Sequence, residues 1–228
     1  MSSFCDKLYL NFIKEERYMY LVNGLKNTLI ITFFAVMIGV ILGFLIAIIR
    51  STYSKTGKLK FLNMLCGIYL TVIRGTPMMV QLLIMFYVVF VSSNNKLLVA
   101  IIAFGINSGA YVAEIVRSGI MSIDQGQFEA GRSLGFSYTR TMWYIIIPQA
   151  FKNVLPALAN EFIVLLKETS ICGYIGLTDL TRGGDIIRSR TYEAFLPLIM
   201  VALIYLIMVA GLSALVKKWE RRLRASDR

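Results

Sequence analysis

Carboxylates interrupt a long apolar stretch near the C-terminal third of the chain. In "NEFIVLLKETSICG", Glu161 and Glu168 lie two helical turns apart, so an α-helix would place both on one face. Ionisable groups inside a membrane are costly, by about 2.5–3.5 kcal/mol each at the centre of a span, and they usually face an interior or a cavity. Two such carboxylates could accept the cationic group of a solute. Alternatively, one pairs with Lys167 or Arg74 and only holds helices together.

A second polar stretch, "IRGTPMMVQLL", places a charge, a glycine and a proline side by side. Proline removes a backbone donor and clashes with the preceding helical turn, which predicts a broken helix at residues 74–77. Two interpretations stay open. Thr76 and Gln81 form a polar wall of a translocation path, or the break is a packing kink in which Arg74 pairs with a carboxylate or extends to the membrane surface.

The third polar stretch is "INSGAYVAEIVRSG". Glu114 precedes Arg117 by three residues, which predicts an ion pair within one helix. Asn107 and Ser108 lie deeper in the apolar stretch and have no such explanation. The candidate substrate contacts are therefore Thr76, Asn107, Ser108, Glu161 and Glu168.

The segments that position these residues have the composition of membrane spans. The chain has 228 residues, of which 57% are hydrophobic, and its mean hydropathy is +0.68. A span needs about 20 mainly apolar residues. We therefore predict an all-α integral membrane protein with a single domain over residues 1–228 and five transmembrane helices at about 24–49, 64–92, 97–117, 149–172 and 194–216.

The distribution of Lys and Arg predicts the orientation of these spans. Basic residues concentrate in the loop after the first span, in the loop 118–148 and in the C-terminal tail, which favours an outside N-terminus and a cytoplasmic C-terminus. This topology accounts for the net charge of +11, so no nucleic-acid partner is needed. Phe4, Leu8 and Phe12 recur at helical spacing, which predicts an interfacial helix on the outer face within residues 1–20.

The residue types argue against catalysis by this chain. It has no histidine, and its three cysteines lack metal-ligand spacing, so metal binding and acid–base catalysis are not expected. It also lacks G-x-x-x-x-G-K-[ST], the phosphate-binding loop of many ATPases. We expect no enzyme activity and no cofactor in this chain.

The loop 118–148 has the sequence of two short helices joined by a sharp turn. Asp124 can cap a first helix, Gly135 can end it in the left-handed conformation, and Ser137 can start a second helical stretch before Pro148 marks the next span. Helices this short are marginal in water. We therefore expect a partner to hold them.

The segment "EAGRSLGFSYTRTMWYIIIP" resembles the EAA signature of ABC-importer permeases. The spacing matches at Glu129, Ala130, Gly135, Ile145 and Pro148, while Gly131 replaces Ala and Ile147 replaces Leu. The blocks "NGLKNTLIIT", "IRGTPMMVQLL", "SGAYVAEIVRSGI" and "EFIVLLKETSICGYIGLTDL" extend the resemblance over nearly the whole chain. They are similar to the polar amino-acid uptake branch of these permeases, the His/Glu/Gln/Arg/opine group.

This resemblance implies a MetI-like type I fold and a role as the permease subunit of an ATP-driven importer of polar or charged amino acids in a bacterial cell membrane. It implies an ABC ATPase dimer that binds ATP and Mg²⁺, a second permease subunit that is identical or homologous, and an extracytoplasmic amino-acid-binding protein. The residues implied to couple to the ATPase are Glu129, Ala130, Gly131, Ser133, Leu134 and Gly135. A passive channel for small polar solutes is the alternative.

Overall fold

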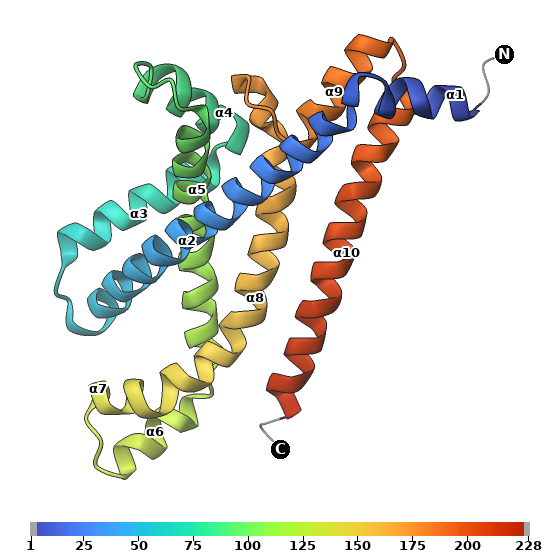
Figure 1. The fold of residues 1–228 in the computed structure, drawn as a ribbon. Helices are drawn as coiled ribbons and strands as arrows, with labels where there is room; N and C mark the ends of the chain where they lie inside the picture. The colour runs from blue at the N-terminus through green and yellow to red at the C-terminus, as the bar shows by residue number, and fades with distance from the viewer. Residues whose placement is uncertain (1–3, 226–228) are drawn as a thin grey trace. The chain divides into compact units, whose positions relative to one another are not determined.

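The computed structural model describes residues 4–225, and all regular secondary structure in that range is helical (Figure 1). This confirms the expected fold class. The α-helices are α1 (Phe4–Leu8), α2 (Tyr18–Thr56), α3 (Lys60–Gly75), α4 (Met78–Ile84), α5 (Lys96–Met121), α6 (Gln125–Ser133), α7 (Tyr138–Thr141), α8 (Ile147–Glu168), α9 (Leu180–Thr191) and α10 (Phe195–Ala225). Short π-helical segments occupy Tyr9–Ile13, Met85–Val89 and Met142–Ile146, and 3₁₀ segments occupy Lys14–Glu16 and Thr169–Ile175.

Three helices of the described residues are long and apolar enough to cross a membrane, namely α2, α5 and α10. They contain or overlap the first, third and fifth predicted spans. Helices α3 and α4 together qualify as one broken span or a re-entrant loop. Helix α8 does not qualify, because polar residues such as Lys152, Asn153, Asn160 and Glu161 lower its hydropathy. The count of five spans therefore stays a prediction.

The predicted break before Pro77 is present. Helix α3 ends at Gly75, and Pro77 has an extended backbone with φ −64° and ψ 138° immediately before α4. The Nε2 group of Gln81 donates to the carbonyl oxygen of Thr76 at 3.0 Å and to its Oγ1 at 2.8 Å. The Gln81 amide thus satisfies backbone and side-chain oxygens that the proline leaves outside any helix.

The chain divides into two compact units, which we describe separately. Unit 1 comprises residues 1–37, 76–105 and 162–212, and unit 2 comprises 38–75, 106–161 and 213–228. The expectation of a single domain stays a prediction.

The apolar core of unit 1 joins the N-terminal helical segments to α2, α9 and α10. Its buried members are Phe12, Leu21, Leu180, Ile187, Leu196 and Val201. Gly183 permits the close approach of α9 to α2, because a Cβ atom there would lie 2.4 Å from the carbonyl oxygen of Tyr20. Asn11 is fully buried and donates to Glu193 Oε2 at 2.8 Å. The N-terminal segment is helical as predicted, and it is packed into this core; its membrane position stays a prediction.

The core of unit 2 packs α2 and α8 against α5. Val112 and Val154 lie in one cluster with Ala47 and Val116, and Leu70 of α3 lies in a second cluster with Ile46. Glycines allow these contacts. A Cβ atom at Gly43 would lie 2.5 Å from Cγ1 of Val112, and one at Gly39 would lie 2.7 Å from Oγ of Ser108. Small residues at this spacing let two membrane helices approach closely.

Candidate functional site

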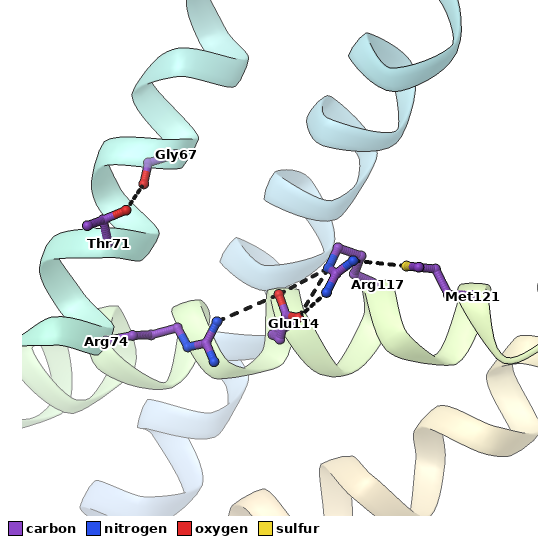
Figure 2. Close-up of polar contacts among 6 residues, drawn as sticks. All are labelled: Gly67, Thr71, Arg74, Glu114, Arg117 and Met121. Carbon is purple, nitrogen blue, oxygen red and sulfur yellow. Dashed lines mark hydrogen bonds and ion pairs between the residues drawn. The ribbon is translucent and has the colours of Figure 1, made fainter.

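An ion-pair network in unit 2 is centred on Glu114. Both carboxylate oxygens accept from Nε of Arg117 at 3.1 Å, and Nη2 of Arg117 also bonds Oε1. Nη1 of Arg74 lies 3.7 Å from Oε2 of the same carboxylate. Figure 2 shows Arg74 extending from α3 towards Glu114 and Arg117 on α5. The structure therefore confirms the predicted pair within α5 and identifies Glu114 as the carboxylate that pairs with Arg74.

A cavity of about 640 Å³ lies next to this network. Its lining carries both signs of charge, with the carboxylates of Glu114 and Glu161 and the cationic groups of Arg74 and Lys152. Neutral polar groups complete the wall, among them Tyr111, Ser118 and Asn153. Such a wall offers acceptors to an ammonium group and donors to a carboxylate group, which is the pairing that a zwitterion requires.

Glu161 joins this cavity to the polar residues in the interior of α5. Its side chain is buried, and Oε1 accepts a hydrogen bond from Oγ of Ser108 at 3.0 Å. Ser108 is fully buried and the adjacent Asn107 is 3% exposed; neither lines the cavity. Among the predicted contacts, the structure thus brings Ser108 and Glu161 together directly, and Glu161 alone reaches the cavity wall.

The remaining two predicted contacts, Thr76 and Glu168, belong to unit 1. Thr76 accepts the amide of Gln81, as described above. Glu168 is the last residue of α8, is half-buried, and is followed by the 3₁₀ segment Thr169–Ile175, whereas Lys167 beside it is exposed. A joint action of all five residues stays a prediction.

Sequence reasoning missed the contribution of the first half of α8 to the cavity. Lys152, Asn153 and Pro156 all line it. Asn153 also donates to Oγ of Ser122 at 2.9 Å, which connects α8 to the end of α5. Pro156 lies inside α8, and an interior proline in a membrane helix is the signal that could have identified this region.

The helices of the loop 118–148 begin and end where the sequence predicts. Oδ1 of Asp124 accepts from the backbone N–H of Gly126 at 2.7 Å at the start of α6, and Oγ of Ser137 accepts from the N–H of Arg140 at 3.5 Å at the start of α7. Gly135 has φ +76°, a left-handed conformation that glycine adopts without steric cost. Figure 1 shows α6 and α7 as a pair that leads into α8.

Gly131 explains how α6 and α7 pack together. It is the buried residue of α6, and a Cβ atom there would lie 2.6 Å from Cγ2 of Thr141 and 3.2 Å from Cδ1 of Ile145. Glycine thus fits this contact better than the alanine of the EAA signature. The other implied coupling residues, Glu129, Ala130, Ser133, Leu134 and Gly135, are all exposed, and Leu134 is 72% exposed. Leu134 is the C-cap residue of α6, and its role in coupling stays a prediction.

The re-entry at Pro148 differs in detail from the expectation of a separate second helix. Helix α7 continues through the π-helical segment Met142–Ile146 directly into α8, so that Pro148 is the second residue of α8. The π-helical segment lies directly before Pro148, where the helical hydrogen-bond pattern must accommodate the missing N–H of proline. Ile146 is fully buried with Ile123 and Ala150, and this small core fixes α6 and α7 to the start of α8.

Comparison with known proteins agrees with this architecture. The model of one protein family, the binding-protein-dependent transport system inner membrane component, matches residues 35–225. The arginine transport system permease protein ArtQ of Bacillus subtilis (strain 168) is 36% identical over 211 residues, covering 91% of this chain and 94% of that protein. The putative glutamine transport system permease protein GlnP of Rickettsia prowazekii (strain Madrid E) is 35% identical over 208 residues, covering 90% and 93%.

Solved structures show the same likeness. The "crystal structure of an amino acid ABC transporter with histidines" has a TM-score of 0.85 and 45% identity, covering 92% of this chain and 98% of that one. An inward-facing MetNI methionine ABC transporter has a TM-score of 0.71 at 22% identity, covering 92% and 98%, which supports the fold alone. The chain is therefore a membrane-embedded subunit of a transport system. It belongs to the family of binding-protein-dependent transport system inner membrane components, which confirms the family resemblance of its sequence.

Proposed function

We propose that this chain is the transmembrane permease subunit of an ATP-driven importer for polar or charged amino acids. The observation that carries the proposal is the cavity of unit 2, whose wall presents both carboxylates and cationic groups. A free amino acid carries an ammonium and a carboxylate, so both of its charged groups would find complements there. The names of relatives, which concern arginine, glutamine and cystine, support the same substrate class.

Within this cavity Glu161 is the proposed contact for a cationic group of the substrate. Ser108 donates to its Oε1 at 3.0 Å, and Glu161 is also part of the cavity lining. Asn107 and Ser108 in unit 2, and Thr76 and Glu168 in unit 1, are the other proposed substrate contacts, and none of them lines this cavity. Glu114 is already shared by two arginines, so we assign it to positioning Arg74, whose guanidinium is the proposed partner of the substrate carboxylate.

Coupling to ATP hydrolysis is assigned to the exposed side of α6 and its turn. Leu134 and the residues around it would dock into an ABC ATPase subunit, which binds ATP and Mg²⁺ and supplies the hydrolysis that this chain does not perform. The buried Gly131 and the core around Ile146 would transmit the movement of α6 to α8, the helix that carries Glu161. The switch between outward- and inward-facing states is then a displacement of packed helices.

The remaining parts of the proposal concern assembly and orientation. A second permease subunit, identical or homologous, would complete the pathway, and an extracytoplasmic binding protein would deliver the amino acid. The chain would cross the bacterial cell membrane several times, with its N-terminus outside and its C-terminus in the cytoplasm. The excess of Lys and Arg in the predicted cytoplasmic loops supports this orientation.

The deciding experiment is to purify the chain with its ATPase and binding protein, reconstitute the complex in vesicles, and measure ATP hydrolysis with each of the common amino acids. We expect a small set of polar or charged amino acids to stimulate hydrolysis and to accumulate in the vesicles only with ATP. The permease alone, in matched vesicles, should show no flux. Solute flux through the permease without ATP or partners would instead support the passive channel.

A further inference from the structure

A second polar region of unit 2 lies outside the amino-acid cavity, where α3 meets the end of α2. It is a groove of about 410 Å³ lined by Arg50, Gly67, Leu70, Thr71, Arg74 and Gly75. A neighbouring hollow of about 420 Å³ shares Arg50 and Leu70 and adds the hydroxyl groups of Ser51, Tyr53 and Ser54. Arg50 thus lines both hollows, and it does not line the amino-acid cavity.

The charges around this groove do not balance. Arg74 and Arg117 share the single carboxylate of Glu114 (Figure 2), and Glu114 also lines the hollow beside Arg50. Among the side chains that the structure describes, none forms a hydrogen bond or close ion pair with the guanidinium of Arg50, and Glu114 acts on it only at longer range. A partly buried guanidinium without a hydrogen-bonded acceptor is costly, and an anion in the groove would lower that cost.

The floor of the groove is open. Cβ atoms built at Gly67 and Gly75 would meet nothing within 4 Å, so both glycines border open space. The hydroxyl of Thr71 donates to the carbonyl oxygen of Gly67 at 2.9 Å. This bond holds the hydroxyl against the backbone of α3, which forms one wall of the groove. Gly67, Thr71, Arg74 and Gly75 recur at helical spacing, which places one small and polar stripe along α3.

A stripe of exposed apolar side chains runs along α3 beside this polar stripe. Phe61, Leu65, Ile68 and Val72 follow the same helical spacing, and all are exposed, Phe61 by 66%. A molecule with a phosphate group and apolar chains would match both stripes at once, because guanidinium groups bind phosphate through paired hydrogen bonds and basic pockets between membrane helices bind anionic headgroups.

We propose that the groove between α2 and α3 binds the phosphate group of an anionic membrane phospholipid, with the guanidinium of Arg50 as its ligand. The acyl chains lie along the apolar stripe of α3. Arg74 lines both this groove and the amino-acid cavity, whereas Arg50 lines the groove and the neighbouring hollow but not that cavity. Variants at Arg50 therefore test the lipid site without removing a proposed substrate contact, and a failure of either proposal would leave the other standing. The membrane is one source of a phosphate group and free phosphate is the other; the experiment separates the two.

The test compares lipid retention in the purified complex of this chain with its ATPase. Phosphatidylglycerol that remains bound after detergent extraction is counted by native mass spectrometry for the wild type, Arg50→Gln, Arg50→Lys and Lys60→Gln. We expect about one phosphatidylglycerol per copy of this chain, about tenfold weaker retention in Arg50→Gln, and an intermediate value in Arg50→Lys, which keeps the charge but loses the paired geometry. Lys60 is exposed and lines neither hollow, so Lys60→Gln should match the wild type. Equal retention in the wild type and Arg50→Gln would overturn the proposal.

Two further arms address the source of the phosphate and the folding of the variant. Millimolar inorganic phosphate should leave the bound phosphatidylglycerol in place; displacement by inorganic phosphate would reject the lipid as the ligand in favour of free phosphate. If Arg50→Gln does not assemble, the wild type in phosphatidylcholine nanodiscs is titrated with phosphatidylglycerol. A rise in thermal stability that saturates near one lipid per copy supports the site, and a rise without saturation contradicts it.

Discussion

At the scale of single residues, Glu161 is both buried and a proposed substrate contact. Its carboxylate is 8% exposed, bonded to Ser108 and part of the cavity wall. Replacement by glutamine keeps the acceptor for Ser108 but removes the negative charge. We expect Glu161→Gln to raise the KM for uptake of a basic amino acid by about tenfold or more, because a hydrogen bond to a charged group is lost, and to change the thermal stability little.

Uptake into vesicles that contain the complete transporter checks this prediction. The matched control is Glu16→Gln, which removes the same charge at an exposed position of unit 1. Uptake kinetics of Glu161→Gln that equal those of the control would show that Glu161 only holds α5 and α8 together.

Asp179 provides a residue-scale prediction about pH outside the membrane spans. It is fully buried and caps α9 by accepting from the N–H groups of Thr181 at 2.9 Å and Arg182 at 3.3 Å. Burial raises the pKa of this carboxyl to about 6, against the lowering effect of those N–H donors. The folded state therefore binds a proton that the unfolded state releases from about pH 4, and this group's contribution to stability falls as the pH rises from about 4 to about 6.

Asp179→Asn should remove that contribution to the pH dependence while it keeps an acceptor for the cap. We expect the Tm of the variant to fall less than that of the wild type over this pH range, by a few degrees, and the two proteins to differ most near neutral pH. Thermal unfolding of the detergent-solubilised protein at several pH values measures this. Parallel Tm curves for the two proteins would show that Asp179 does not titrate in this range.

At the scale of elements, a role of the turn after α6 in coupling can be distinguished from the general loss of stability that a substitution at a positive-φ glycine causes. Gly135 and Gly57 both have positive φ, +76° and +65°, and a Cβ atom at either would meet nothing within 4 Å. Valine at either position carries a similar backbone cost, of about 1–2 kcal/mol. We expect Gly135→Val and Gly57→Val to lower the free energy of unfolding by similar amounts, and only Gly135→Val to abolish substrate-stimulated ATP hydrolysis.

Both variants are measured in the reconstituted transporter, with binding of the ATPase subunit recorded beside hydrolysis. If Gly57→Val loses stimulation to the same extent, the effect is one of stability, and the turn between α6 and α7 has no special part in coupling.

The elements themselves were predictable from local chemistry to different degrees. The cap at Asp124, the left-handed Gly135 and the break at Pro77 follow from residue type, and all three are present in the structure. Helix α9 was not predicted, because its sequence is polar and we treated residues between the last two spans as a loop. Its stability depends on burying Leu180 and Ile187 in the core of unit 1, and one sequence does not reveal such a contact.

The candidate site was likewise predictable only in part. Residue type alone indicated Glu161 and Ser108, because polar groups deep in apolar helices need a reason. Their hydrogen bond was not predictable, since it depends on which faces of α5 and α8 meet. The pairing of Arg74 with Glu114 was predicted only as pairing with some carboxylate, for the same reason.

At the scale of the whole molecule, the predicted orientation can be tested with the cysteines that the chain already has. Cys5 is exposed, whereas Cys66 and Cys172 are buried. A membrane-impermeant thiol reagent should therefore label Cys5 in intact cells from outside, because the N-terminus is predicted to face outward. In a Cys5→Ser background, a cysteine placed at the exposed Lys60 should react only after the membrane is permeabilised.

Mass-spectrometric detection of the labelled peptides distinguishes the two sites. Labelling of the position-60 variant in intact cells, together with no labelling of Cys5 in the wild type, would reverse the orientation inferred from the basic residues.

The contact between Gly39 and Ser108 places a limit on how this protein can diverge. Any side chain at position 39 would overlap the hydroxyl of Ser108, and that hydroxyl bonds Glu161. A Cβ atom at position 39 would also lie 2.8 Å from Cβ of Ser108, so a lineage that gains alanine at position 39 must reduce position 108 to glycine or move α2 away from α5, and with glycine it loses the donor that holds Glu161. The close packing of α2 on α5 and the polarity of the site are thus inherited together, and we expect positions 39 and 108 to change as a pair among descendants that alter their substrate.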